Sequence, residues 1–254
     1  MKYSRSSLLL LLLFWPFTAL VLLCDSQVVA QFSDNGQLWS NLLAPVFLLL
    51  LMTRLSPQRQ LMVALFVPLS ALGETIFSLV FGLYEYRFHA VPIYVPFGHS
   101  ILMSVGLMLS DTQFVQQNLR RVQIGLLAFH GALILGALVF FGDTLSTLWA
   151  VIFILLLKKR IATPFYLILG VLVLYVEILG TRWGVWVWGA EPFGIFRTVN
   201  PPVGAFTCYV IGDLLAMKIA LHLQTRWKLR QEKRLLPSES LTSDSPTSDS
   251  PTSA

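Results

Sequence analysis

The sequence predicts an all-α fold, a polytopic bundle of about eight transmembrane helices. Of the 254 residues, 56% are hydrophobic and only 12% are charged, whereas about a quarter of a typical soluble domain is charged. Apolar runs recur along most of the chain, many of them close to the roughly 20 residues that a helix needs to cross a bilayer. Basic residues gather at the ends of alternate runs. Together these observations exclude an ordinary soluble domain.

The alternation of basic residues gives the expected topology. Lys and Arg lie before the first run and after the second, fourth, sixth and eighth, and the loops between carry few. Because short basic loops stay in the cytoplasm, we expect a protein of the bacterial inner membrane with both termini cytoplasmic. The net charge of +5 is then explained without a nucleic-acid partner. The expected spans are 7–24, 38–53, 60–82, 98–116, 122–141, 145–157, 163–183 and 201–222.

The chain divides into three expected parts. Residues 1–223 form the membrane bundle, with halves near 1–121 and 122–223. Residues 224–236 are basic with interspersed apolar side chains, which is typical of a helix on the membrane surface. Residues 237–254 are rich in Ser, Thr, Pro and Asp, so we expect a disordered tail. A cleaved signal peptide is the alternative interpretation of the first run, whose length favours an uncleaved span.

Two similar segments follow each other at an offset of four spans. Each has a glutamate late in an apolar run, then a glycine, then two aromatic residues separated by one position. A proline and a glycine follow near the start of the next span. An offset of four spans suggests two parallel four-helix repeats; the alternative is chance, because Tyr and Trp prefer membrane interfaces. The matching residues are Glu74, Gly82, Tyr84 and Tyr86 in the first segment and Glu177, Gly184, Trp186 and Trp188 in the second.

Three acidic residues lie inside predicted spans, and we take them as candidate catalytic residues: Glu74, Glu177 and Asp213. An acid near the bilayer centre costs about 2.5–3.5 kcal/mol on insertion scales, so each of the three side chains is expected to lie beside other polar groups. We therefore expect the three to share one interior cavity in the outer half of the bundle. The alternative is a structural polar network, such as an ion pair of Glu74 with His99 or of Glu177 with Arg182.

Polar and aromatic side chains near these acids are the candidate substrate-binding residues. Aromatic faces can stabilise a cation, and a carboxyl group in low dielectric can act as a proton donor. The sequence contains no CxxC, HExxH or GxGxxG pattern, so we expect acid–base chemistry without a metal or cofactor. The candidates are Tyr84, Tyr86, His99, Trp186, Trp188, Asn200 and Tyr209.

The first segment resembles the membrane-embedded carotenoid hydratase family and its bacterial relatives. The resemblance covers about a tenth of the chain, and the second segment departs from it at Asn200-Pro201-Pro202. It implies proton-initiated chemistry on a polyisoprenoid, with Glu74 as the acid. The residues that carry it are Glu74, Phe81, Gly82, Tyr84, Tyr86, Val91 and Pro92.

Three functions stay open at this point. One is an enzyme that modifies an isoprenoid or another membrane lipid, as a hydratase or cyclase does. The second is a carrier that moves a proton together with a small solute. The third is a structural membrane protein without catalysis. Membrane lipids are the expected partners in each case, and the sequence gives no oligomeric state.

Overall fold

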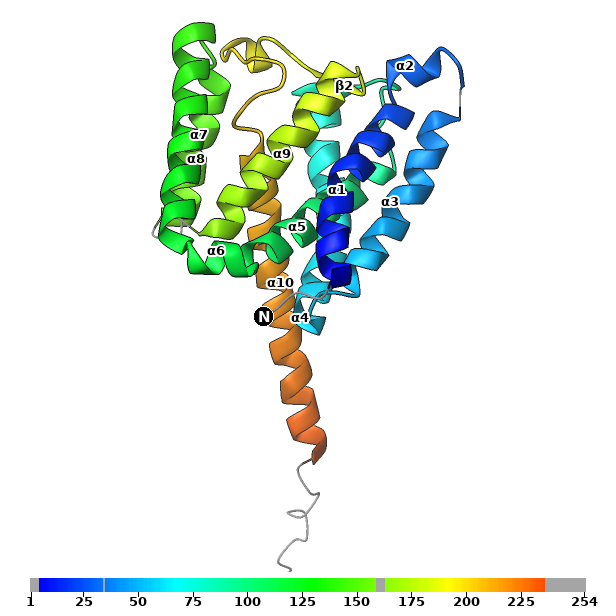
Figure 1. The fold of residues 1–254 in the computed structure, drawn as a ribbon, viewed down its shortest axis with the longest axis vertical. Coiled ribbons are helices and arrows are strands. Elements are labelled where there is room, and N and C mark those ends of the chain that lie inside the picture. Colours follow the sequence, from blue (N-terminus) through cyan, green and yellow to red (C-terminus); the bar gives the residue numbers. More distant parts are fainter. Residues whose placement is uncertain (1–4, 34, 159–162, 236–254) are drawn as a thin grey trace, which may run out of the picture.

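The computed structural model describes residues 5–33, 35–158 and 163–235, with side chains up to Arg226. The described chain is mostly helical (Figure 1). Its elements are α1 (Arg5–Cys24), α2 (Gln27–Ala30), α3 (Gly36–Met52), α4 (Pro57–Glu74), the π-helix η1 (Thr75–Val80), β1 (Tyr84–Tyr86), α5 (Tyr94–Ser110), α6 (Gln113–Gln117), α7 (Leu119–Phe141), α8 (Thr144–Leu157), α9 (Pro164–Arg182), β2 (Trp186–Trp188), the 3₁₀-helix η3 (Pro192–Gly194) and α10 (Phe206–Leu235).

The helices are those of a membrane protein. Within the described residues, five are long and apolar enough to cross a bilayer: α1, α4 with η1, α7, α9 and the part of α10 from Phe206 to Arg226. Three shorter apolar helices accompany them: α3, α5 and α8. Large apolar side chains are exposed along these helices, for example Leu12, Val139 and Leu155. Such a surface suits contact with lipid, and the predicted polytopic helical bundle is confirmed.

Several helices begin where the sequence carries a start signal. Pro57 and Pro164 stand in the first turns of α4 and α9, where proline loses no helical hydrogen bond. At α8 the side chain of Asp143 accepts from the backbone N–H of Ser146 at 2.8 Å, which satisfies an otherwise free donor. These signals explain why the helix starts lie close to the span boundaries expected from the apolar pattern.

Two short strands depart from the all-α prediction. β1 and β2 pair antiparallel, with Tyr84 opposite Trp188 and Tyr86 opposite Trp186. Each strand has three residues, its two aromatic side chains buried and its middle residue exposed. The ribbon joins the loops that follow η1 and α9, so it connects the two halves of the chain. Segments this short give too little alternation to predict a strand.

The ribbon and α2 lie at one end of the bundle, and α6 lies at the other end (Figure 1). α10 begins inside the bundle, where the ring of Phe206 packs against His130 at 5.1 Å between centroids. It then runs as one continuous helix to Leu235 and projects past the α6 end (Figure 1). The backbone of 224–235 therefore continues α10 as helix, and the predicted tail 237–254 lies outside the described residues.

Candidate functional site

The site is organised around the β1–β2 ribbon, and two glycines start its strands. Gly82 and Gly184 have φ angles of +62° and +67°, a left-handed conformation that glycine adopts without steric cost. Each glycine stands two residues before the first aromatic residue of its strand. At each glycine the chain turns away from its helix and enters the strand. The two aromatic side chains of that strand are buried against the bundle.

The first strand holds Glu74. Tyr84 and Tyr86 donate their phenolic O–H groups to Oε2 of Glu74 at 2.7 and 2.5 Å. Oε1 of the same carboxylate lies 2.7 Å from Nε2 of His99 on α5. Glu74 ends α4 immediately before η1, and such π-helical insertions often accompany functional positions. Three groups therefore surround the buried carboxylate. One of them is His99, the partner expected for Glu74 in a structural polar network.

The second strand holds Glu177 in the same manner. Trp186 and Trp188 donate their indole N–H groups to Oε2 of Glu177, both at 2.9 Å. Among the described residues no group hydrogen-bonds Oε1, so one oxygen of this carboxyl stays free. The proposed partner Arg182 takes no part. A Cβ at Gly180 would meet the Trp186 ring, so this glycine lets the indole lie against α9 and reach Glu177.

Both glutamates line one cavity of about 260 Å³. Its lining includes Glu74, Glu177, His99 and the four ribbon aromatics, and most of the remaining wall is apolar, with Thr18, Ser70, Tyr94 and Tyr209 as the other polar side chains. The wall comes from α1, α3, α4, η1, α5, α9 and α10, and includes Phe14, Phe17, Phe66, Leu69, Leu72, Ile76, Phe77, Leu102, Val176, Ile211 and Leu215. The arrangement suits a ligand with a long apolar part and one small reactive or polar end.

The phenols of the ribbon are fixed as donors. Burial, and secondarily the negative charge of Glu74, raises the pKa of Tyr84 well above its usual 10.0, and the same causes raise the pKa of Tyr86. Both side chains therefore keep their protons over the physiological range, and each has a carboxylate to donate to. The two tyrosines therefore hold Glu74 in place as hydrogen-bond donors.

His99 has an aromatic partner on its far side. Its ring stacks on Tyr209 of α10, with 4.1 Å between centroids and planes 10° apart. Both residues line the cavity. The stack joins α5 to α10 and orients the imidazole toward Glu74, so two of the predicted substrate-binding residues do lie beside the acids.

Two predicted site residues lie elsewhere. Asp213 is buried, at 2% exposure, but it does not line the cavity. It takes a hydrogen bond from Tyr166 near the start of α9, because the 100° turn between successive helical residues carries it away from Gly212. Asn200 also stays outside the cavity, and its Oδ1 accepts from the backbone N–H of Trp188 at 3.3 Å. The expectation of one cavity shared by all three acids is therefore wrong for Asp213, and Asn200 supports β2.

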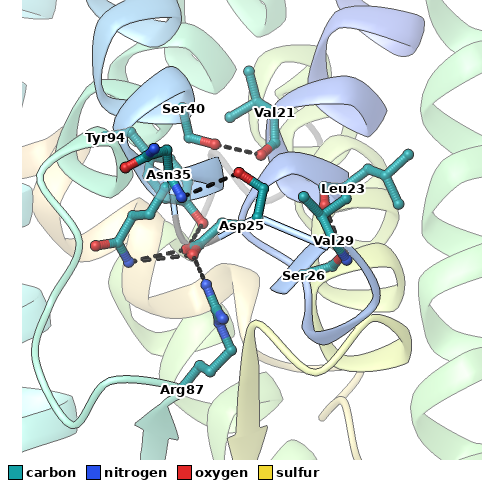
Figure 2. A network of polar contacts seen from close by, with 11 residues as sticks. Val21, Leu23, Asp25, Ser26, Val29, Asn35, Ser40, Arg87 and Tyr94 are labelled. Carbon is teal, nitrogen blue, oxygen red and sulfur yellow. Dashed lines mark hydrogen bonds and ion pairs between the residues drawn. The ribbon is translucent and has the colours of Figure 1, made fainter. Parts of the chain in front are cut away.

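A second polar cluster was not predicted from the sequence. Asp25, at the end of α1, is 1% exposed and lies 2.9 Å from Nη2 of Arg87, just after β1. The phenol of Tyr94 donates to the other carboxylate oxygen at 3.0 Å, and the amide of Gln37 adds a weaker contact (Figure 2). The cluster ties β1 to α1, α3 and α5. Two features of the sequence could have indicated this cluster. Asp25 directly follows an apolar run, and Arg87 is the one Lys or Arg in the loop 83–97.

The ribbon also has an outer face. A surface groove of about 510 Å³ lies there, lined in part by Glu85, His89 and Val187. Tyr84, Tyr86 and Trp188 line this groove as well as the inner cavity, so the ribbon is the wall between the two spaces. Within the described residues, no group of three or more His, Cys, Asp or Glu side chains is arranged to hold a metal ion.

Comparison with known proteins gives no match: no protein-family model fits the chain, and no curated protein or solved structure is similar to it. The resemblance of one short segment to carotenoid hydratases thus has no support from these comparisons.

Proposed function

We propose that the protein is an integral membrane enzyme that performs acid–base chemistry on an isoprenoid or other lipid chain, in the manner of a hydratase or cyclase. One observation carries this proposal: two buried carboxyl groups line the same apolar cavity, and one of them, Glu177, keeps a free oxygen. A purely structural carboxylate is expected to have its acceptor oxygens occupied, as Glu74 does.

The two acids differ in their surroundings, and the difference suggests two roles. Glu74 accepts from three donors, one of them His99, which is an arrangement for a permanent carboxylate that stabilises positive charge. Glu177 has only two neutral indole donors and is the better proton carrier. Pairs of titratable groups in contrasting environments are the usual basis of acid and base assignment. The geometry thus favours Glu177 over Glu74 as the acid.

A hydration illustrates the chemistry. The carboxyl of Glu177 gives its proton to one carbon of a double bond, and the oxygen of a water molecule bonds to the other carbon. The spare proton of that water returns to the carboxylate. The net reaction adds water to the alkene and needs no metal or redox partner, and Glu74 stabilises the cationic stage electrostatically.

The decisive experiment compares lipid extracts of a strain lacking the protein with strains that express defined variants. Glu177→Gln should lose the wild-type change in lipid composition, because glutamine keeps the acceptor oxygen for the indoles but carries no acidic proton. General acid–base groups contribute about 10²–10⁴-fold. Glu85→Gln, an exposed acid on the outer face of β1, is the matched control and should behave as wild type. Full activity of Glu177→Gln would exclude the proposal.

The finer topology belongs to the same proposal. The five long helices and three shorter ones make eight spans, with the basic ends of α3, α7 and α8 on the cytoplasmic side of a bacterial inner membrane. The start of α1 and the projecting end of α10 lie at the same end of the bundle (Figure 1), which supports two cytoplasmic termini. Reporter fusions at Ala90 and Ala190 should then report the outside, and fusions at Gln58 and Gln117 the cytoplasm.

A proton-coupled carrier is the second candidate, and one observation favours it. Each half of the chain contributes a glutamate held by an aromatic pair two residues past a left-handed glycine. Such correspondence supports an internal repeat, and repeats that move against each other are common in carriers. Reconstituted protein that dissipates a pH gradient only when a small solute is present, without altering any lipid, would favour the carrier over the enzyme.

A further inference from the structure

We propose that the ligand enters the cavity sideways from the membrane, through a mouth between α4 and α10, and that it is the flexible hydrocarbon chain of a membrane lipid. The inference rests on the proposed function only for its reactive end, since the mouth can be tested by binding alone. It excludes a small polar solute as the occupant.

Three apolar side chains locate the mouth, because they line the cavity and are also exposed on the outside of the protein. Leu72 on α4 lines the cavity and is 57% exposed, and Ile211 and Leu215 on α10 line it and are 37% and 45% exposed. Both helices are long and apolar enough to cross a membrane. Exposed apolar side chains on such helices face lipid, so the cavity opens to the bilayer at these residues.

Two helical stripes form the walls of this mouth. The first stripe consists of Leu69, Leu72 and Gly73 on α4 and Ile76 on η1, and the α10 stripe of Cys208, Ile211, Gly212 and Leu215. Both follow the spacing of one helix face. A glycine stands in each stripe. A Cβ on Gly73 would meet no atom within 4 Å, whereas one on Gly212 would meet Phe66 at 2.6 Å. Gly73 therefore borders open space.

The path to water on the outer side is closed by the ribbon. Its four aromatic residues are each less than 10% exposed, and the residues just before them, Leu83 and Val185, are 2% and 1% exposed. The aromatic side chains are also tied to the two glutamates by hydrogen bonds. A polar solute from the outer solution would have to displace this wall, whereas a lipid chain that enters past Leu72, Ile211 and Leu215 meets a mostly apolar lining.

The direct packing of the two helices beside the mouth favours a slender chain over a bulky ring system. α4 and α10 pack directly against each other, so only a slender group can pass between them. Inside, most of the wall is apolar, and Glu74, His99 and Glu177 are among its few polar side chains. A hydrocarbon chain with a hydroxyl or a double bond at its inner end matches this distribution, because its apolar length replaces lipid contacts and its end reaches the free oxygen of Glu177.

Photolabelling of the full-length protein in lipid nanodiscs tests the inference. The probes are a saturated long-chain alcohol and an isoprenoid alcohol, each with a diazirine near the hydroxyl end. Labelled positions are mapped by mass spectrometry. We expect label on the segments that contain Tyr84–Tyr86 and Glu177–Trp188, and the stronger of the two probes identifies the source of the chain.

Gly73→Trp fills the mouth and should lower this inner labelling about tenfold, a loss of about 1.4 kcal/mol in binding. Gly131→Trp is the matched control, because a Cβ there also meets nothing within 4 Å and Gly131 lies on α7, outside the cavity. Leu72→Trp narrows the mouth from its lipid-facing side and serves if Gly73→Trp does not fold. Unchanged inner labelling in a folded mouth variant, or label confined to outer helix faces, would overturn the inference.

Glu177→Gln separates this inference from the proposed function. The variant should keep inner labelling while it loses lipid modification, because the apolar wall is intact and the glutamine amide can still hydrogen-bond a hydroxyl but has no acidic proton. Inner labelling by a wild-type protein that modifies no lipid would retain the mouth and reject the enzyme. Lipid modification without inner labelling would reject the mouth and retain the enzyme.

Discussion

Tyr84 and Trp188 face each other across the β1–β2 ribbon, with 4.5 Å between ring centroids, and they donate to different carboxylates. The phenol of Tyr84 reaches Glu74 and the indole of Trp188 reaches Glu177. The ribbon therefore couples two acids that belong to different halves of the chain. A change in one strand should therefore alter the surroundings of both carboxyl groups.

Removal of either indole donor should destabilise the protein. Trp186→Phe and Trp188→Phe each leave buried Glu177 with one donor, and an unmade hydrogen bond to such a group costs about 1–3 kcal/mol. Thermal unfolding in detergent measures the loss. Trp39→Phe is the control, because Trp39 lies on α3 and is 57% exposed. The double variant should lose more than the sum of the single ones, since Glu177 then keeps no donor. Equal melting temperatures for the ribbon and control variants would contradict the role of the indoles.

The Asp25–Arg87 pair should be a principal anchor of the ribbon. Asp25 is 1% exposed and the Arg87 side chain 15%, and loss of one partner from a buried pair costs about 3–5 kcal/mol. We expect Asp25→Asn to lower thermal stability by an amount of this order. It should also lower activity, because Arg87 directly follows β1 and the strand can shift once the contact with Asp25 is lost.

An exposed ion pair on the same side of the protein provides the comparison. Arg197 and Glu191 lie 3.9 Å apart with side chains 77% and 68% exposed. Exposed pairs contribute about 0.2–1 kcal/mol, so Glu191→Gln should change stability little. A similar loss in Asp25→Asn and Glu191→Gln would show that burial does not matter at Asp25.

Alkaline pH should destabilise the ribbon through its tyrosines. The folded-state pKa values of Tyr84 and Tyr86 lie well above the usual 10.0, so the unfolded chain releases these protons first. Their contribution to stability is complete below pH 10 and falls as pH rises above it. Unfolding followed against pH should show a steeper alkaline loss in wild type than in the double variant Tyr84→Phe, Tyr86→Phe. Identical alkaline slopes would contradict the shifted pKa values.

Much of the site could be predicted from the pattern of glutamate, glycine and paired aromatic residues. Glu74 and Glu177 were expected inside the bundle because a buried acid is costly, and Tyr84 and Trp188 were expected near them. The antiparallel pairing of the two strands could not be predicted, because three residues give no periodicity. The hydrogen bonds from the ribbon to the glutamates depend on that pairing, so they could not be predicted either.

Other features depend on contacts distant in the sequence. Arg87 meets Asp25 across 62 positions, and no local pattern links an acid at a helix end to an arginine in a later loop. Asp213 was expected to share one cavity with Glu74 and Glu177, because an isolated acid inside the membrane is costly. Its placement depends on the rotation of α10 about its own axis, which turns Gly212 toward α4 and Asp213 toward Tyr166. Hydropathy alone does not fix that rotation.

The contact between Gly180 and Trp186 gives the sharpest test of the ribbon. The six-membered ring of Trp186 occupies the space where a Cβ on Gly180 would lie. In Gly180→Ala the indole must therefore move off α9, and its N–H loses the 2.9 Å contact with Glu177. Overpacking of this kind costs about 1–3 kcal/mol. The substitution should lower the melting temperature and, if the proposed function is correct, the activity as well.

A matched glycine and a second substitution make this prediction specific. Gly131→Ala on α7 meets nothing within 4 Å and should be neutral or slightly stabilising, because alanine favours helix over glycine by about 1 kcal/mol. Trp186→Phe shortens the side chain and removes the clash, so Gly180→Ala should cost much less in a Trp186→Phe background than in wild type. This non-additivity is the signature of direct contact. If Gly180→Ala costs the same in both backgrounds, Trp186 does not lie against α9, and the arrangement inferred for Glu177 is wrong.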